Sequence, residues 1–148
     1  MTFKCKFNMI IIVCCWAILP FSPLNALAEE AVVVIANKDV PSEKLTPDKI
    51  KKIFLGEVMN WENNEVITVV LLGDETVHKE FIHKYIKRTP AQFLNVWRRN
   101  LFTGKGAMPT QMDNIDDLIK YVANTKGAIG YVPADANLTG NVKIIDQK

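Results

Sequence analysis

The stretch from Ile50 to Leu72 reads IKKIFLGEVMNWENNEVITVVLL and predicts a short helix, a turn and a strand in succession. Thr46 can cap the helix, and Pro47 suits its first turn because proline lacks the amide hydrogen that is unused there. The apolar residues that recur at helical spacing on one face are Ile50, Ile53 and Phe54. Gly56 is then expected to end the helix. The apolar run at residues 66–72 is typical of a strand buried on both faces, as in a parallel sheet covered by helices.

Strands and helices alternate along the rest of the chain. We expect further strands at residues 32–36, 128–132 and 142–145, and further helices at residues 76–87, from residue 90 after a Thr89–Gln92 capping box, and from Asp113 or Asn114 to Gly127. The predicted core faces of two of these helices are Phe81, Ile82, Tyr85 and Ile86 in one, and Phe93, Leu94, Trp97 and Leu101 in the other. The first two strands and the helix between them predict a right-handed β-α-β crossover. Because there is no internal repeat or linker, the pattern predicts one three-layer α/β domain with a mostly parallel sheet flanked by helices.

The first 28 residues have the pattern of a secretory signal peptide. Two lysines precede an apolar core at residues 7–19, and the small residues at 26–28 form a suitable cleavage site. A retained membrane anchor is the alternative, but the apolar run is shorter than the ~20 residues that span a bilayer, and two prolines follow it. We therefore expect cleavage of residues 1–28, a single domain at residues 29–148 with no stable membrane span, and a periplasmic or secreted location.

Composition argues against several classes of function. All three cysteines lie in the leader, so the remaining chain has no disulfide, thiol nucleophile or thiolate metal ligand. Loss of Lys4 and Lys6 with the leader leaves as many basic residues as the 16 acidic ones, which does not favour nucleic acid as a partner. The only serine after the leader is Ser42, and the five-residue spacing of His78 and His83 disfavours a metal pair. We expect no catalytic residues, no metal and no cofactor.

Two separated motifs resemble the substrate-binding proteins of phosphate-type ABC importers. The first consists of Phe54-Leu55-Gly56, Trp61 and Ile67-Thr68-Val69-Val70, and the second is GAIGYV at residues 127–132. Between them, the residues that resemble a compact, single-lobe subgroup of this family are Trp97, LFTG at 101–104, and Pro109. The similarity extends over residues 32–132. It implies a domain like one lobe of a type II periplasmic binding protein.

The resemblance implies an oxyanion site where a strand leads into a helix, at residues 73–76 in this chain. Phosphate-binding members usually have an arginine at the strand end and a Ser-Gly-Thr group after it, whereas this chain has leucines at 71 and 72, followed by Asp74 and Glu75. These carboxylates satisfy the helix dipole and repel phosphate. A remaining anion grip would use the amide of Gly73 together with Thr76. The alternative is that Asp74 and Thr76 only cap the helix.

A second candidate site is basic. The basic residues between positions 84 and 105, where no acidic residue occurs, are Lys84, Lys87, Arg88, Arg98, Arg99 and Lys105. Of these, Arg98, Arg99 and Lys105 are the predicted ligand-binding residues, since a patch of this kind can face an anion, an acidic partner or anionic lipid. The alternative is a solvated helix face. Trp61 and Trp97 are candidates for stacking on a ligand, but a position in the core is the simpler expectation.

The preferred hypothesis is an exported, non-enzymatic binding module of this family with a lost or altered anion site. In two-lobed relatives both lobes enclose the ligand, and the domain of about 120 residues corresponds to one lobe. The module would therefore act through an envelope protein partner or through self-association, for example as a homodimer. The alternative is capture of phosphate or a similar oxyanion for an ABC importer, with basic residues replacing the missing arginine. An enzyme is the third class, and no residue pattern supports it.

Overall fold

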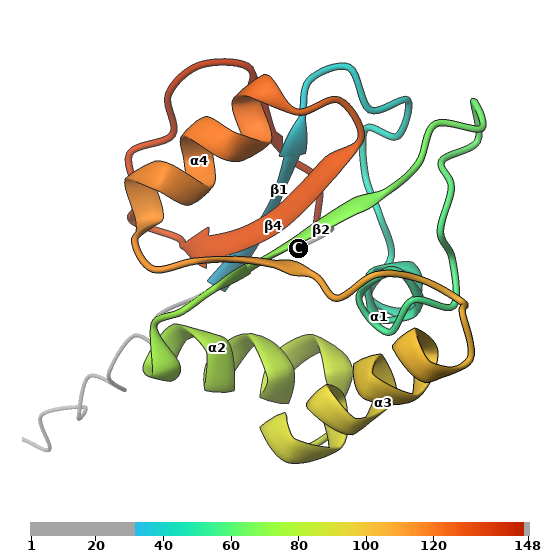
Figure 1. Cartoon of the computed structure of the whole chain (residues 1–148). Helices are drawn as coiled ribbons and strands as arrows, with labels where there is room; N and C mark the ends of the chain where they lie inside the picture. The colour runs from blue at the N-terminus through green and yellow to red at the C-terminus, as the bar shows by residue number, and fades with distance from the viewer. Residues whose placement is uncertain (1–31, 147–148) are drawn as a thin grey trace, which may run out of the picture.

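A five-stranded mixed sheet forms the centre of the structure, a computed structural model that describes residues 32–146 (Figure 1). The strands are β1 (Val32–Asn37), β2 (Thr68–Leu72), β3 (Thr110–Met112), β4 (Ala128–Pro133) and β5 (Val142–Ile144), in the order β3-β2-β4-β1-β5 across the sheet. The helices are α1 (Pro47–Phe54), α2 (Glu75–Phe81), the π-helical segment η1 (Ile82–Ile86), α3 (Pro90–Phe102) and α4 (Ile115–Asn124). The predicted signal peptide at residues 1–28 lies outside the described residues.

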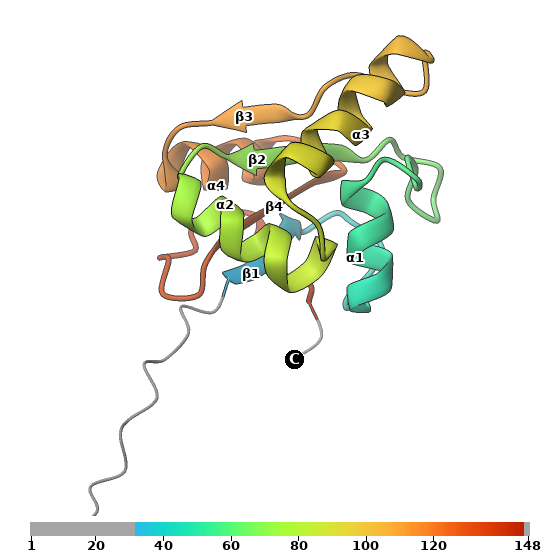
Figure 2. The same ribbon diagram turned by 90° about the horizontal axis from the view of Figure 1, so that it is seen from below.

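Helices cover both faces of the sheet. Helix α4 packs against β1, β2 and β4 on one face, and α1, α2 and α3 lie together on the other, as Figures 1 and 2 show. Beneath the buried strands β1 and β4, the aromatic rings of Phe54, Phe81 and Tyr131 meet, and those of Phe81 and Tyr131 stack with centroids 4.0 Å apart. The prediction of a three-layer α/β domain is confirmed.

Local capping signals placed the helix starts correctly. The Thr46 hydroxyl accepts a hydrogen bond from the Lys49 amide at 3.3 Å at the start of α1. At the start of α3, Thr89 and Gln92 form both hydrogen bonds of the capping box, and Asn114 caps α4. These bonds span only three residues, so the sequence alone is enough to predict them.

The direction of β1 differs from the prediction. Strand β2 pairs in parallel with β3 and β4, whereas β1 is antiparallel to both β4 and β5. Four of the five strands therefore run in the same direction, which makes the sheet mostly parallel, as expected. The prediction of a right-handed β-α-β crossover is wrong, because β1 and β2 are neither adjacent nor parallel. Strand β3 was not predicted, since its three residues show no apolar pattern.

Burial also differs from the prediction at three apolar residues. Strand β2 begins at Thr68, so Val66 lies outside it and is 63% exposed. On α3, Phe93 and Trp97 are buried as expected, but Leu94 is 38% and Leu101 is 49% exposed. The next core position of α3 is taken by a polar residue, Asn100, because that side chain bonds to the end of α1.

Candidate functional site

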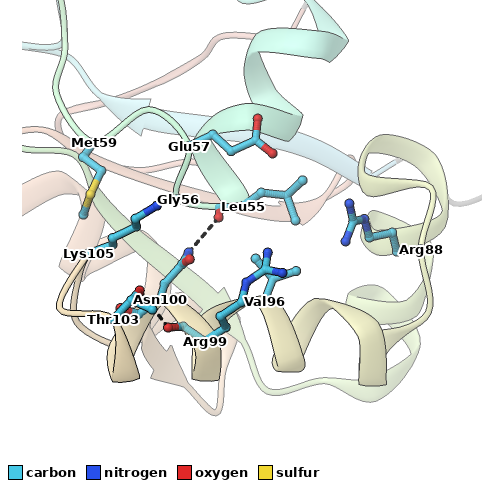
Figure 3. A pocket seen from close by; sticks show the side chains of 10 residues that line it. All are labelled: Leu55, Gly56, Glu57, Met59, Arg88, Val96, Arg99, Asn100, Thr103 and Lys105. Carbon is cyan, nitrogen blue, oxygen red and sulfur yellow. Dashed lines mark hydrogen bonds between the residues drawn. The ribbon is translucent and has the colours of Figure 1, made fainter.

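A cavity of about 540 Å³ lies between the end of α1 and one side of α3 (Figure 3). We call it the basic cavity. The residues that line it are Leu55, Gly56, Glu57, Met59, Arg88, Val96, Arg99, Asn100, Thr103 and Lys105. A second hollow of about 410 Å³ continues along α3 and shares Arg88, Val96 and Arg99 with it. The two together form a depression along this flank of the helix.

Three cationic side chains point toward the basic cavity from different segments. Arg99 projects from α3, Arg88 from the connection before α3, and Lys105 from the loop after it, as Figure 3 shows. None of the three forms an ion pair with any residue between 32 and 146. Among the described residues that line the cavity, Glu57 is the only carboxylate. The local potential is therefore positive and attracts anions.

Hydrogen bonds between α3 and the end of α1 hold the cavity floor. Trp97 Nε1 donates to Phe54 O at 2.9 Å, and Asn100 Nδ2 donates to Leu55 O at 3.0 Å. These carbonyls lie at a helix end, where partners within the helix are missing. Gly56 follows with φ of +69°, and a Cβ at this position would lie 2.9 Å from Asn100 Nδ2. A glycine is therefore required here, and the contacts fix the part of α3 that carries the cavity arginine.

The π-helical segment η1 sets the position of Arg88. Its last residues, Tyr85 and Ile86, are buried, and Lys87 then adopts the left-handed conformation with φ of 57°. The Lys87 amide donates to Ile82 O at 2.9 Å, which closes the helix end. The chain reverses at this point, and Arg88 lies on the cavity side, just before the N-cap residue of α3, Thr89.

The structure brings together two of the three predicted basic site residues. Arg99 and Lys105 line the basic cavity, but Arg98 does not, since adjacent residues of a helix point about 100° apart. Arg88 joins them, although it was not among the predicted ligand-binding residues. Its position just before the capping box is the sequence signal that could have identified it. Lys84 is engaged elsewhere, because its amine donates to the backbone carbonyl of Val32 at 2.8 Å.

The junction after β2 offers few free amides to an anion. Asp74 Oδ1 accepts hydrogen bonds from the amides of Thr76 at 2.9 Å and Val77 at 3.0 Å, and the Gly73 amide donates to Met112 O at 2.7 Å. Asp74 therefore caps α2 as the capping alternative predicted, while Thr76 contributes its amide rather than a capping side chain. Gly73 lines a different hollow and Thr76 is exposed, so neither residue joins the basic cavity.

Both tryptophans belong to the core. Trp61 is 3% and Trp97 is 4% exposed, and their indole N–H groups donate to Gly127 O and Phe54 O, each at 2.9 Å. The expectation that they are core residues is confirmed.

The part of the chain that the structure describes shows neither a metal site nor a membrane-spanning helix. Residues 32–146 include no group of three or more His, Cys, Asp or Glu side chains that could hold a metal ion. In the same range, no helix is long and apolar enough to cross a bilayer.

The solved structures that match this chain include three phosphate-related proteins. An ABC-type phosphate transport receptor from Vibrio cholerae matches with a TM-score of 0.56 and 14% identity, over 77% of this chain and 44% of that one. A possible phosphate binding protein from Planctomyces limnophilus matches with a TM-score of 0.56 and 18% identity, over 78% and 41%. PstS from Borrelia burgdorferi matches with a TM-score of 0.51 and 17% identity, over 70% and 40%. This chain thus spans less than half of the length of each, and at these identities the likeness concerns the fold.

The sequence itself identifies the family. A comparison with curated proteins gave no significant match. The family model described as a PBP superfamily domain, however, matches residues 26–144, which is most of the sequence. The resemblance carried by the FLG and GAIGYV motifs is therefore confirmed, and the chain belongs to the PBP superfamily domain family.

Proposed function

We propose that this domain is an exported, non-enzymatic binding module that holds phosphate or a chemically similar oxyanion in the basic cavity. The observation that carries the proposal is the convergence of Arg88, Arg99 and Lys105 on one cavity. Family membership supports a binding role, and two of the matching structures are described as a phosphate transport receptor and a possible phosphate binding protein. Delivery of the ligand to an ABC importer is a further step of the same proposal.

The side chains of the basic cavity suit a tetrahedral oxyanion. A guanidinium group presents paired N–H donors that match two oxygens of a phosphate, while an ammonium group acts as a compact charge. Glu57 adds selectivity, because its carboxylate can accept a hydrogen bond from a protonated phosphate oxygen. Sulfate carries no proton at neutral pH and would meet only repulsion there. We therefore expect phosphate to bind more tightly than sulfate.

The basic cavity is a better anion site than the strand–helix junction that the family resemblance points to. At the junction, the carboxylate of Asp74 already occupies the amides of Thr76 and Val77. An anion would have to displace that carboxylate and then lie beside it. In the basic cavity, the cations have no ion-pair partners among residues 32–146, so an incoming anion displaces only water.

The expected affinity is modest. A hydrogen bond to a charged group contributes about 1.5–3 kcal/mol. Two or three such bonds, reduced by the cost of ordering long side chains, correspond to a Kd between about 10 µM and 1 mM. Because the binding is electrostatic and the cavity is open to solvent, the affinity should fall as the salt concentration rises.

The test is a titration of the protein with phosphate and with sulfate, in which binding is measured by calorimetry and by amide NMR shifts. Arg99→Gln should weaken phosphate binding by about tenfold or more, since it removes a charge-assisted contact. Arg98→Gln is a matched control, because it removes the same charge from the neighbouring residue, which does not line the cavity. Its effect should stay within about twofold at 0.15 M salt, where charges are screened over about 8 Å.

Two results would contradict the proposal. Absence of heat and of NMR shifts at millimolar phosphate would show that the protein does not bind the anion. Equal losses for Arg98→Gln and Arg99→Gln would show that only the overall charge matters and that the basic cavity is not the site.

A second candidate function is self-association or binding to an envelope protein. It is favoured by the apolar C-terminal end of α3, where Phe102 is 88% and Leu101 is 49% exposed. Sedimentation velocity over a hundredfold concentration range would detect a homodimer, and Phe102→Ser should dissociate it. A monomer at every concentration would exclude self-association.

A further inference from the structure

An apolar hollow lies on the other flank of α3 from the basic cavity. It is bounded by the end of β2, the start of α2, α3 itself and the segment that leads into β3, and its volume is about 360 Å³. Its apolar walls include Leu71, Phe93, Leu94, Trp97, Met108 and Pro109. At its mouth, Leu94 and Met108 are 38% and 42% exposed. Pockets for small molecules typically have volumes of about 300–1,000 Å³ and mainly apolar walls, so this hollow is of the right size and character.

His78 contributes its imidazole ring to the lining of this hollow. Its Nδ1 lies 2.5 Å from the hydroxyl of the buried Tyr131, and the same hydroxyl oxygen accepts a hydrogen bond from the Leu72 amide at 3.2 Å. The contact with Nδ1 is shorter than the 3.4 Å contact with the other acceptor, Leu72 O, which favours donation of the tyrosine hydrogen to Nδ1. In that tautomer the second ring nitrogen, Nε2, carries a hydrogen. No described residue accepts a hydrogen bond from it.

The surroundings of the imidazole favour its neutral form. Burial lowers the pKa of His78 below its usual value. The ring also packs edge-on against Phe93, with centroids 5.8 Å apart, in the wall of the hollow. At neutral pH the hollow thus presents an uncharged imidazole, together with the side-chain amide of Gln111, within a mainly apolar surface.

The described lining of the hollow includes one carboxylate and no cation. Glu75 lines it, and its carboxylate pairs with Lys79 at 2.7 Å on the exposed side of α2. Asp113 Oδ1 would lie 3.1 Å from a Cβ placed on Gly73, which also lines the hollow. Among the described lining residues, none is a lysine or an arginine. The described lining offers an anion no cationic partner, so the chemistry differs from that of the basic cavity.

We propose that the apolar hollow is a second binding site, for a small uncharged molecule with an aromatic or branched aliphatic body and one hydrogen-bond acceptor, such as a carbonyl oxygen. The apolar body contacts Phe93, Leu94 and Trp97. The acceptor receives the hydrogen of His78 Nε2. The site uses neither Arg88 nor Arg99, so it does not depend on oxyanion binding.

Two probe molecules of the same shape test the proposal. Acetophenone has a carbonyl oxygen, and α-methylstyrene has a methylene group in its place. In NMR titrations of the 15N-labelled protein, acetophenone should produce saturable shifts at Leu94 and at the Trp97 indole. It should bind about two- to tenfold more tightly than α-methylstyrene, the effect of one neutral hydrogen bond.

Two variants test whether the probes bind in the apolar hollow. Ala91 is exposed and lines the hollow, so Ala91→Phe should fill the mouth and weaken both probes at least tenfold without disturbing the core. Arg99→Gln, which alters the basic cavity, should leave probe binding unchanged. The two proposals therefore fail independently.

Several outcomes would overturn the proposal. They are an absence of saturable binding, equal affinities for the two probes, and an affinity that Ala91→Phe does not change. A concentration-dependent dimer that Leu94→Lys dissociates would also overturn it, because the hollow would then be a protein interface.

Discussion

Replacing Gly127 by alanine should destabilise the domain far more than the same change at Gly104. Both glycines have left-handed backbones, with φ of +69° and +68°. At Gly104 a Cβ would meet nothing within 4 Å, whereas at Gly127 it would lie well inside contact distance of Val66 O and 3.4 Å from Trp61 Nε1. The pair therefore separates backbone strain, which the two sites share, from crowding, which only Gly127 has.

The magnitude follows from the contacts around Gly127. A left-handed alanine costs roughly 1–2 kcal/mol at either site, partly offset by about 0.4–1 kcal/mol from the lower entropy of the unfolded chain. Overpacking at Gly127 adds about 1–3 kcal/mol. The Gly127 carbonyl also accepts hydrogen bonds from Trp61 Nε1 at 2.9 Å and from the Thr68 amide at 3.1 Å, and weakening them adds about 1 kcal/mol. The difference between the two variants should thus be about 2–4 kcal/mol.

Urea unfolding followed by tryptophan fluorescence measures this difference, because the Trp61 indole bonds directly to Gly127. A loss of this size is a large part of the roughly 5–15 kcal/mol that stabilises a typical domain. It should lower the Tm by roughly 8–20 °C, with an unchanged denaturant slope. Equal losses for Gly127→Ala and Gly104→Ala would refute the reasoning, since the close approach of Val66 would then contribute nothing.

Three further predictions concern polar side chains in or beside the core. Tyr131→Phe should lower the free energy of unfolding by about 1–3 kcal/mol in urea titrations, because the Leu72 amide loses its acceptor. Tyr121 is the control, since its hydroxyl has no hydrogen bond to a described residue, and Tyr121→Phe should cost less than about 0.5 kcal/mol. Burial lowers the pKa of His78, so the unfolded chain binds a proton that the folded domain does not. The stability measured in thermal melts should therefore fall as the pH drops through about 6.5, by at most about 1.4 kcal/mol per pH unit. His78→Gln should flatten this pH dependence, and an unchanged profile in the variant would contradict the prediction. Asn100→Ala should lower the free energy of unfolding by about 1–3 kcal/mol and weaken phosphate binding measured by calorimetry, because the hydrogen bond from α3 to the end of α1 is lost. Unaltered phosphate binding would show that this hydrogen bond does not position the basic cavity.

Only part of the candidate site could be predicted from the sequence. The basic run between residues 84 and 105 was visible, but which of its members converge was not. Arg99 enters the basic cavity and Arg98 does not, because the packing of Trp97 and Asn100 on α1 sets the rotation of α3. Glu57 reaches the same cavity from a segment far away in the sequence, and no local pattern indicates that contact.

The sequence by itself determined the α/β class, the family and the ends of most helices. The reason is that caps such as Thr46 and Asp74 act on amides two or three residues away, and glycine stops act on their own backbone. The tertiary structure decided the antiparallel direction of β1, the edge strand β3 and the grouping of cations beside α3. These features depend on contacts between residues far apart in the chain, where the burial of apolar surface over the whole sheet outweighs any local preference.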